Sequence, residues 1–416
     1  MLSALFRCSC LRASRDVGLS YRRNESGINS SVGQPNDSET VSTLTAFHIE
    51  DDKRSSRNSM YCKPFPTPTH WSDPFRPVKN PSRSYQLCDF ELIKVLGVGT
   101  SGTVRLAKHC ASNAFVALKI ISKRHILEHR QEKHLLRERS VHSTLSHPFI
   151  ANLYGTFQDP HYLYFVLQHL PGGDLWRYVY GEHVSMTEKR KGIPEDHAVF
   201  YLGCVLLALA YLHDHAHVLY RDLKLENIAL DADGYPKLVD FGFADFQPPK
   251  SAIRHTFCGS IDYMPPEILQ HHGHDHRADI WSYGVLMYEL LHGRTPFYHE
   301  NAYQHSQNIV FNSVKFDAEI EALHPQACDL ISKILVKNPD DRITSMDLIR
   351  LHPFFTRYYS NSDDWSRLWR REWKAPFIPF ENQSSISEDA NVSESEPFSE
   401  PIESDAETDT HVFHSF

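Results

Sequence analysis

The chain has 416 residues, of which 41% are apolar and 23% charged, so it is long enough for a large core and for two or three domain-sized units. Its formal charge is −9, and residues 381–411 hold ten Asp and Glu but no Lys or Arg. A net acidic chain without a basic block argues against a nucleic acid as the main partner.

The eight cysteines are scattered without a CxxC pair, which favours a reduced, intracellular setting. We therefore expect a cytoplasmic protein, with the nucleus as a second location. No stretch reaches the roughly 18 apolar residues of a membrane span, and the longest, 198–212, is expected to be a core helix. The first residues contain Arg but no acid before Asp16, so a transit peptide, acylation at Cys8 and Cys10, and an unstructured end are all open.

The N-terminal extension, residues 1–89, is expected to be mostly disordered because it is rich in Ser, Asn, Pro and charge. Apolar and polar residues then alternate over 90–97 and 103–109, and an apolar run follows at 114–121. These patterns predict antiparallel strands. Helical spacing over 133–145 predicts one helix, and 149–158 and 162–170 are interpreted as two more strands.

After Pro171-Gly172-Gly173 the pattern becomes helical. The segments 198–213 and 279–293 are apolar nearly all round, which predicts buried helices, and 227–231 and 236–242 are short strand-like pieces. The order predicts an α+β fold with two lobes and a tail. Its parts are a small antiparallel β lobe with one main helix at 90–167, a hinge at 168–172, a larger, mostly helical lobe at 173–355, and a C-terminal tail at 356–416.

A G-x-G-x-x-G-x-V run joins the first two predicted strands and comprises Leu96, Gly97, Gly99, Gly102 and Val104. Glycines let backbone amides approach phosphate oxygens, although a Gly-rich hairpin turn would explain the run taken alone. A dinucleotide-binding loop is disfavoured, because a strand and not a helix follows the run.

Lys119 follows Gly102 by seventeen residues, on the strand where a cation can hold the α- and β-phosphates of a nucleotide. Glu138, in the predicted helix, can pair with this lysine and fix its position. Glu128 and Glu132 compete for the same role, and spacing alone leaves the choice open.

The most informative stretch, residues 220–227, reads YRDLKLEN. Asp222 can accept the proton of an attacking hydroxyl, Lys224 can neutralise charge on a transferring phosphoryl group, and Asn227 can bind magnesium. Eighteen residues after Asp222, Asp240 opens an Asp-Phe-Gly turn whose carboxylate can bridge magnesium to phosphate oxygens. Each motif alone could be an ordinary charged loop, but together and in this order they predict phosphoryl transfer from ATP and Mg²⁺.

With these motifs in order between Phe90 and Phe355, the sequence resembles eukaryotic protein kinases. Within them it looks like the AGC group, and most like its cAMP-dependent branch. The resemblance implies an ATP- and Mg²⁺-dependent serine/threonine kinase with a bilobal fold. It also implies that Glu138 is the partner of Lys119.

The resemblance assigns further residues to ATP binding and to the large lobe. It implies that Asp279 anchors the catalytic segment and that Glu267 forms a buried ion pair with Arg342. Besides the glycine loop and Lys119, it places the following residues at the nucleotide: Ala117, Leu167, Gln168, Leu170, Asp174, Glu226 and Asn227.

Peptide recognition is implied for Asp174, Glu226 and Glu289, which fall where AGC kinases carry acids that read arginines. We therefore expect a protein or peptide substrate with Arg two and three residues upstream of the acceptor Ser or Thr. For Asp174, an acid on a solvated face is the alternative interpretation.

Regulation is implied at two places. Thr256 matches the activation phosphosite, where a phosphate from an activating kinase or from autophosphorylation would pair with Arg221. The terminal Phe413 and Phe416 match a tail that docks on the small lobe and steadies the Glu138 helix. A cyclic-nucleotide-binding regulatory subunit is a further partner suggested by the resemblance, although His255 replaces a tryptophan of close relatives.

Two rival functions differ in class. A pseudokinase acting as a scaffold is disfavoured because the catalytic residues are retained, and a small-molecule kinase is disfavoured by the peptide-style activation segment. His142 departs from the apolar residue of relatives and is expected to be a satisfied core histidine. The histidine-rich stretch 271–276 resembles a metal cluster, but a solvated turn is the preferred interpretation.

Overall fold

The structure, a computed structural model, describes residues 85–99, 102–181, 192–247, 254–379, 410–413 and 416. Predictions for residues 1–84, for the tip of the glycine loop at 100–101 and for the acidic stretch at 381–409 lie outside these ranges.

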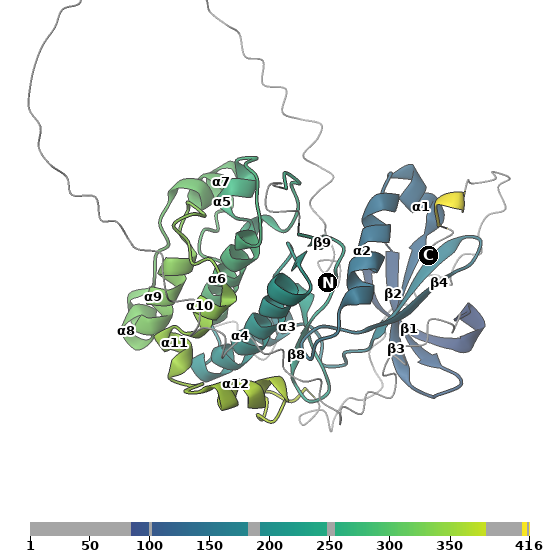
Figure 1. The fold of residues 1–416 in the computed structure, drawn as a ribbon, viewed down its shortest axis with the longest axis horizontal. Coiled ribbons are helices and arrows are strands. Elements are labelled where there is room, and N and C mark those ends of the chain that lie inside the picture. The colour runs from purple at the N-terminus through teal and green to yellow at the C-terminus, as the bar shows by residue number, and fades with distance from the viewer. Residues whose placement is uncertain (1–84, 100–101, 182–191, 248–253, 380–409, 414–415) are drawn as a thin grey trace, which may run out of the picture. The chain divides into compact units, whose positions relative to one another are not determined.

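A five-stranded antiparallel sheet forms the small lobe, with strands in the order β1-β2-β3-β5-β4 (Figure 1). Because side chains alternate along a strand, Val116 and Leu118 of β3 face one apolar core, whereas Leu163 and Phe165 of β5 face a second core on the other side. The strands are β1 (Phe90–Gly99), β2 (Gly102–His109), β3 (Phe115–Ser122), β4 (Leu153–Gln158) and β5 (Tyr162–Gln168).

Two helices follow β3, α1 (Lys123–Glu128) and α2 (Glu132–Thr144). Helix α2 is the main helix predicted from sequence. Helix α1 was not predicted, because six residues are too few for a helical period to stand out. It begins where the Ser122 hydroxyl accepts a hydrogen bond from the His125 amide at 3.3 Å, a common N-terminal cap.

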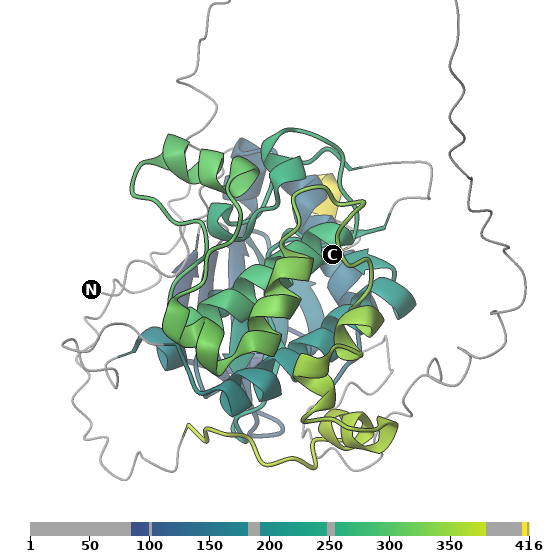
Figure 2. The same cartoon turned by 90° about the vertical axis from the view of Figure 1, so that its left-hand side faces the viewer.

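The large lobe is a bundle of helices (Figure 2). Helix α4 (Glu195–Ala210) continues into a wider turn at Tyr211–His215, and every residue of α6 (Arg277–His292) after Arg277 is buried. The other helices are α3 (Leu175–Tyr180), α5 (Pro266–Leu269), α7 (Ala302–Phe311), α8 (Ala318–Leu323), α9 (Pro325–Ile334), α10 (Met346–Arg350), α11 (Pro353–Thr356) and α12 (Ser362–Trp369).

Helix α4 with its terminal turn is the one described helix long and apolar enough to cross a membrane. Of its most apolar stretch, 78% is buried inside the protein, as expected for a core helix. The helix is packed against α6, α10 and α12.

Two short two-stranded sheets flank the catalytic segment and the Asp-Phe-Gly turn. Strand β6 (Val218–Leu219) pairs with β9 (Asp245–Phe246), and β7 (Ile228–Leu230) pairs with β8 (Pro236–Leu238). The segment 220–227 lies between β6 and β7, and the Asp-Phe-Gly turn lies between β8 and β9. Short 3-10 turns complete the fold at Leu87–Asp89, Leu225–Asn227, Ile261–Tyr263 and Thr410–Phe413. The α+β, two-lobed prediction is therefore confirmed.

Candidate active site

Lys119 and Glu138 form an ion pair between β3 and α2. Their Nζ and Oε1 atoms are 2.6 Å apart, and the side chains are only 14% and 9% exposed. Burial alone would lower the pKa of Lys119, but the carboxylates of Glu138 and Asp240 outweigh it and raise that pKa. The competing Glu128 is paired with Arg124 instead, so geometry selects Glu138.

The glycine loop is the hairpin between β1 and β2, in which Gly97 is opposite Val104 and Gly99 is opposite Gly102. Gly102 has a φ of +149°, and a Cβ there would lie 2.2 Å from the carbonyl oxygen of Ile120. This glycine is therefore required by the close approach of β3 as well as by any phosphate.

The residues assigned to the adenine pocket lie where β3 meets β5. Ala117 is opposite Leu167 in the β3–β5 register, and Gln168 ends β5. The backbone amide of Gln168 donates to the Asn152 carbonyl at 2.9 Å, so this amide is already engaged within the chain. Leu170 follows in the connection to the large lobe and is half-buried.

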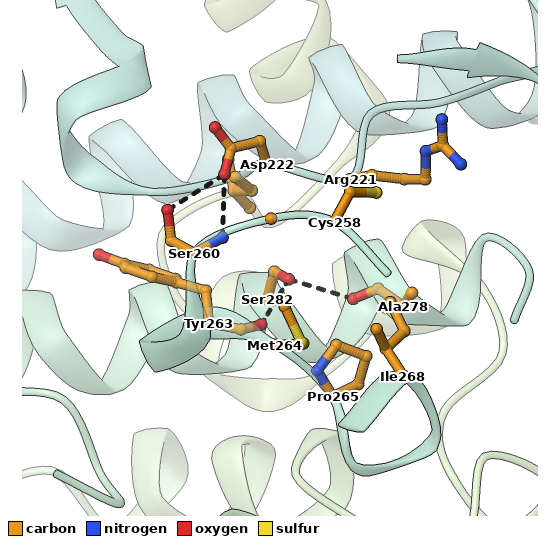
Figure 3. A pocket seen from close by; sticks show the side chains of 12 residues that line it. Arg221, Asp222, Cys258, Ser260, Tyr263, Met264, Pro265, Ile268, Ala278 and Ser282 are labelled. Carbon is orange, nitrogen blue, oxygen red and sulfur yellow. Dashed lines mark hydrogen bonds between the residues drawn. The ribbon is translucent and has the colours of Figure 1, made fainter. Parts of the chain in front are cut away.

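Asp222 is held by side chains of the catalytic segment and by Ser260, whose two hydrogen bonds to it are drawn in Figure 3. Its Oδ2 accepts hydrogen bonds from Lys224 Nζ at 2.7 Å and from Asn227 Nδ2 at 2.8 Å. Its Oδ1 accepts from both the amide and the hydroxyl of Ser260, each at 3.2 Å. Burial raises the pKa of Asp222, while Lys224 opposes that shift. A partly desolvated carboxylate of fixed orientation suits a group that receives a proton.

Ser260 was not singled out by sequence reasoning. Its hydroxyl also accepts from Lys224 Nζ at 2.9 Å, so it joins the activation segment to the catalytic segment. The preceding Gly259 has a φ of +101°, and a Cβ there would lie 2.7 Å from the Arg221 carbonyl. The sequence signal was the Gly-Ser pair shortly after Thr256, which carries no chemistry by itself.

The catalytic segment is anchored on α6. The backbone amides of Tyr220 and Arg221 donate to Asp279 Oδ2 and Oδ1 at 2.9 and 2.7 Å, and His213 Nε2 is 2.8 Å from Oδ2. Burial would raise the pKa of Asp279, but these hydrogen bonds lower it. The predicted anchor is confirmed. The role of His213 was not predicted, because it reads as the end of an apolar helix.

Arg221 and Asp240 both have left-handed backbone conformations, with φ of 67° and 56°. Such conformations are unusual for residues other than glycine and cluster at functional sites. Asp240 Oδ1 accepts from the Gly242 amide at 3.1 Å and lies 3.9 Å from Lys119 Nζ. Its side chain is 35% exposed, so this carboxylate is available to a ligand.

The Phe241 ring packs between His142 of α2, tilted by 36° at a centroid distance of 4.5 Å, and Tyr220, which it meets edge-on at 5.3 Å. The His142 Nε2 is hydrogen-bonded to the Ala151 carbonyl at 2.8 Å, and burial lowers the pKa of His142 to about 4. The interpretation of His142 as a satisfied core histidine is confirmed.

The three acids assigned to peptide recognition influence one another. Burial raises the pKa of Glu226, and the carboxylates of Asp222 and Asp174 raise it further. Burial also raises the pKa of Glu289 to about 7, although the hydroxyls of Tyr263 and Tyr180 donate to it.

Asp174 is more than an acid on a solvated face, because its side chain is only 15% exposed. Its Oδ1 caps α3 by accepting from the Arg177 amide at 2.8 Å, and its Oδ2 lies 3.6 Å from the Arg177 Nε. Part of its charge is therefore already compensated within the chain.

The terminal phenylalanines lie in the second small-lobe core. Phe413 is fully buried and Phe416 is 8% exposed, and both pack with residues of α1, α2 and β5. The Gln158 Nε2 donates to the Phe413 carbonyl at 2.8 Å, and the Thr156 hydroxyl donates to the Phe416 carbonyl at 3.1 Å.

The remaining predictions met mixed outcomes. Thr256 is exposed, and its phosphorylation stays a prediction. The ion pair of Glu267 and Arg342 is confirmed at 2.9 Å. In the described part of the chain no three His, Cys, Asp or Glu side chains form a metal site. A wholly solvated turn at 271–276 is nevertheless wrong for His274, which is buried because its backbone pairs with Arg254.

This arrangement of a lysine–glutamate pair, a glycine hairpin, a buried aspartate and a turn carboxylate defines a nucleotide-dependent phosphotransferase. A family model described as "Protein kinase domain" matches residues 90–355. The chain therefore belongs to the protein kinase family.

Similar proteins indicate which group of protein kinases the chain belongs to. The chain is 36% identical to cAMP-dependent protein kinase type 3 of Saccharomyces cerevisiae over 310 residues, which covers 74% of this chain and 73% of the relative. It is 34% identical to the human cAMP-dependent protein kinase catalytic subunit PRKX, covering 76% and 82%, and 34% identical to the human serine/threonine-protein kinase Sgk2, covering 73% and 78%. The protein is thus an ATP-dependent serine/threonine protein kinase of the AGC type.

Proposed function

We propose that this kinase transfers the γ-phosphoryl group of ATP to Ser or Thr residues that follow arginines. The observation that supports the preference is a chain of neighbouring acids, in which the carboxylates of Asp222 and Asp174 act on Glu226 and that of Glu226 acts on Glu289. Carboxylates that are partly withdrawn from water bind guanidinium groups well, because the charge-assisted hydrogen bonds compete with less solvent.

Within this proposal, Asp222 orients the acceptor hydroxyl and takes its proton, and Lys224 neutralises charge on the transferred group. Lys119, fixed by Glu138, holds the phosphates. The carboxylate of Asp240 and the amide oxygen of Asn227 are donors that suit Mg²⁺, and these two residues would hold it. Bound there, the ion would neutralise phosphate charge.

The side chains of the acid group favour one arginine position over the other. Glu289 accepts hydrogen bonds from the hydroxyls of Tyr180 and Tyr263. Among the described residues Glu226 forms no ion pair, although the charge of Lys224 acts on it, whereas Asp174 is paired with Arg177. We therefore propose that Glu226 and Glu289 read the arginine two residues upstream of the acceptor and that Asp174 reads the one three residues upstream. The first of these arginines then contributes more to binding.

A peptide library with single Arg substitutions, phosphorylated by purified full-length protein with Mg²⁺ and ATP, tests the preference. We expect kcat/KM to fall by tenfold or more when Arg two residues upstream is replaced by Ala. Glu226→Gln should remove this difference, and Glu321→Gln, an exposed acid on α8, serves as the matched control. Equal rates on both peptides would refute the preference and leave the kinase activity itself intact.

The scaffold alternative makes the opposite prediction for Asp222→Asn. A kinase loses phosphoryl transfer in this variant, whereas a scaffold retains its function. Lys119, Glu138, Asp222, Asn227 and Asp240 are all present, and the described geometry favours catalysis.

A regulatory partner is a separate proposal. Two of the similar proteins carry "cAMP-dependent" in their names, whereas His255 beside Thr256 departs from the tryptophan of close relatives. We propose that a cyclic-nucleotide-binding subunit inhibits this kinase. A purified regulatory subunit should then lower peptide phosphorylation, and cAMP should restore it. Unchanged activity at micromolar subunit would refute the partnership.

A further inference from the structure

Three arginines from three segments converge on one carboxylate, that of Asp245 in β9. Asp245 Oδ1 is 3.2 Å from Arg137 Nε, and its Oδ2 is 3.6 Å from Arg221 Nη2 and 3.3 Å from Arg254 Nη2. The Asp245 side chain is only 5% exposed. None of these contacts was anticipated from the sequence.

Each arginine is next to a residue of the active site or the activation segment. Arg137 precedes Glu138 in α2, Arg221 precedes Asp222, and Arg254 lies two residues before Thr256. The Asp245 carboxylate therefore ties together the helix that fixes Lys119, the segment that holds the catalytic aspartate, and the activation segment.

Backbone contacts aim the arginines at the same place. The Arg221 Nε donates to the Phe243 carbonyl at 2.7 Å, and the Arg254 Nη2 donates to the Phe246 carbonyl at 3.2 Å. Strand β9 itself pairs with β6, with Asp245 opposite Leu219. The acceptors of these arginines, Asp245 and the carbonyls of Phe243 and Phe246, thus all lie in the stretch that directly follows the Asp-Phe-Gly turn.

Charge explains why the acid matters. The Arg221 side chain is 3% exposed, whereas those of Arg137 and Arg254 are 35% and 34% exposed. Water therefore screens the repulsion among the guanidinium groups least at Arg221. Burial lowers the pKa of the nearby His134 and His274, and arginine lowers it further, against the effect of nearby carboxylates. With Asp245 the cluster carries a net charge of about +2, and without it about +3.

The Arg221 guanidinium group already has partners within the chain. The Thr256 side chain is exposed, and the arginine expected to bind its phosphate is already engaged by Asp245 and by Phe243. In the same structure Lys119 is paired with Glu138, and the Phe241 ring packs between those of His142 and Tyr220. The chain therefore brings together the arginine cluster, the Lys119–Glu138 pair and the packed Phe241 ring through its own side chains.

We propose that Asp245 is a positioning residue that supplies, from within the chain, the negative charge that gathers Arg137, Arg221 and Arg254, so that the kinase is active with Thr256 unphosphorylated. The proposal rests on the phosphotransferase activity and is independent of the preference for arginine in the substrate.

The test uses full-length protein whose Thr256 is shown by intact mass to be unphosphorylated after phosphatase treatment. We expect this protein to be active, and Thr256→Val to keep kcat within threefold of it. Asp245→Asn should lower kcat by tenfold or more at a melting temperature close to that of the wild type, with a smaller change in the KM for ATP. Asp245→Glu should recover part of the loss, because it restores the charge.

A second acid provides a readout that a purely structural role would not change. In the Asp245→Asn background, Thr256→Glu should raise kcat again, since it brings a carboxylate to the same arginines from the activation segment. The same Thr256→Glu change in the wild-type background should have little effect. If Thr256→Glu raises kcat only in the Asp245→Asn background, the two carboxylates act on the same arginines.

Several results would overturn the proposal. They are an unphosphorylated wild type that gains tenfold or more in kcat upon phosphorylation of Thr256, an Asp245→Asn variant with wild-type kcat, or no recovery by either acid. Should Asp245→Asn fail to fold, the comparison of phosphorylated and unphosphorylated wild type still decides. A wild type that is inactive in both states would instead contradict the phosphotransferase activity.

Discussion

Glu289 should make the arginine preference depend on pH. Burial raises the pKa of this carboxyl to about 7, whereas an exposed glutamate titrates near 4.3. With a pKa of about 7, roughly a tenth of the carboxyl is ionised at pH 6 and roughly nine tenths at pH 8. If only the carboxylate binds the guanidinium group, selectivity for arginine should rise on the order of tenfold between these pH values.

The assay compares two peptides that differ only in Arg or Ala two residues before the acceptor. The kcat/KM ratio of the two peptides cancels the titration of groups that both reactions share, such as Asp222, and kcat/KM reports the free enzyme. The ratio should increase from pH 6 to pH 8 with a midpoint near 7.

Glu289→Gln is the matched variant, because it keeps the side-chain shape and can still accept a hydrogen bond from Tyr263 or Tyr180. Its ratio should be low and flat over the same range. A flat ratio in the wild type, or the same slope in Glu289→Gln, would refute the assignment of Glu289 to arginine recognition.

Three other perturbations follow from the geometry. Arg177→Ala frees Asp174 from an ion pair of 3.6 Å. Because half-exposed pairs are worth at most about 1 kcal/mol, the kcat/KM preference for Arg three residues upstream should rise by up to about fivefold. An unchanged kcat/KM ratio of the Arg and Ala peptides would contradict the proposed competition between Arg177 and the substrate. Arg342→Met leaves Glu267 buried without its partner and should cost about 3–5 kcal/mol of unfolding free energy in urea, whereas Arg124→Met, from an exposed pair, should cost under about 1 kcal/mol. Phe413→Ala empties a fully buried site beside α2. It should lower kcat and should reduce the free energy of unfolding by up to about 3–5 kcal/mol, which a lower melting temperature would show. Phe311→Ala, at an exposed position, is the control, and equal behaviour of the two variants would argue against a supporting role for the tail.

Much of the fold was predictable because its signals are local. Alternation marked the strands of the small lobe, and the unbroken apolar character of 279–293 marked α6, which is buried all round. The limits of β4 were less well predicted. The apolar run began at residue 149, but the strand starts at Leu153, because Phe149 and Ile150 instead reach toward β8, where Ile150 bridges Leu238.

The candidate site was predictable where motifs carry chemistry in a fixed order, as in Lys119, Asp222 and Asp240. Contacts between distant segments were not predictable from one sequence. Spacing could not choose Glu138 over Glu128, and nothing local distinguishes Asp245 from an ordinary surface acid. Its partners come from residues 137, 221 and 254, and only the folded chain brings those positions together.

The left-handed backbone conformation of Asp240 and Arg221 sets folding stability against catalytic activity in this protein. Each such residue costs on the order of 1–3 kcal/mol relative to a relaxed conformation, and glycine or asparagine would relieve part of that cost. A selection for heat resistance alone would consequently favour Asp240→Gly or Asp240→Asn, and the survivors would be sturdier proteins that no longer phosphorylate anything.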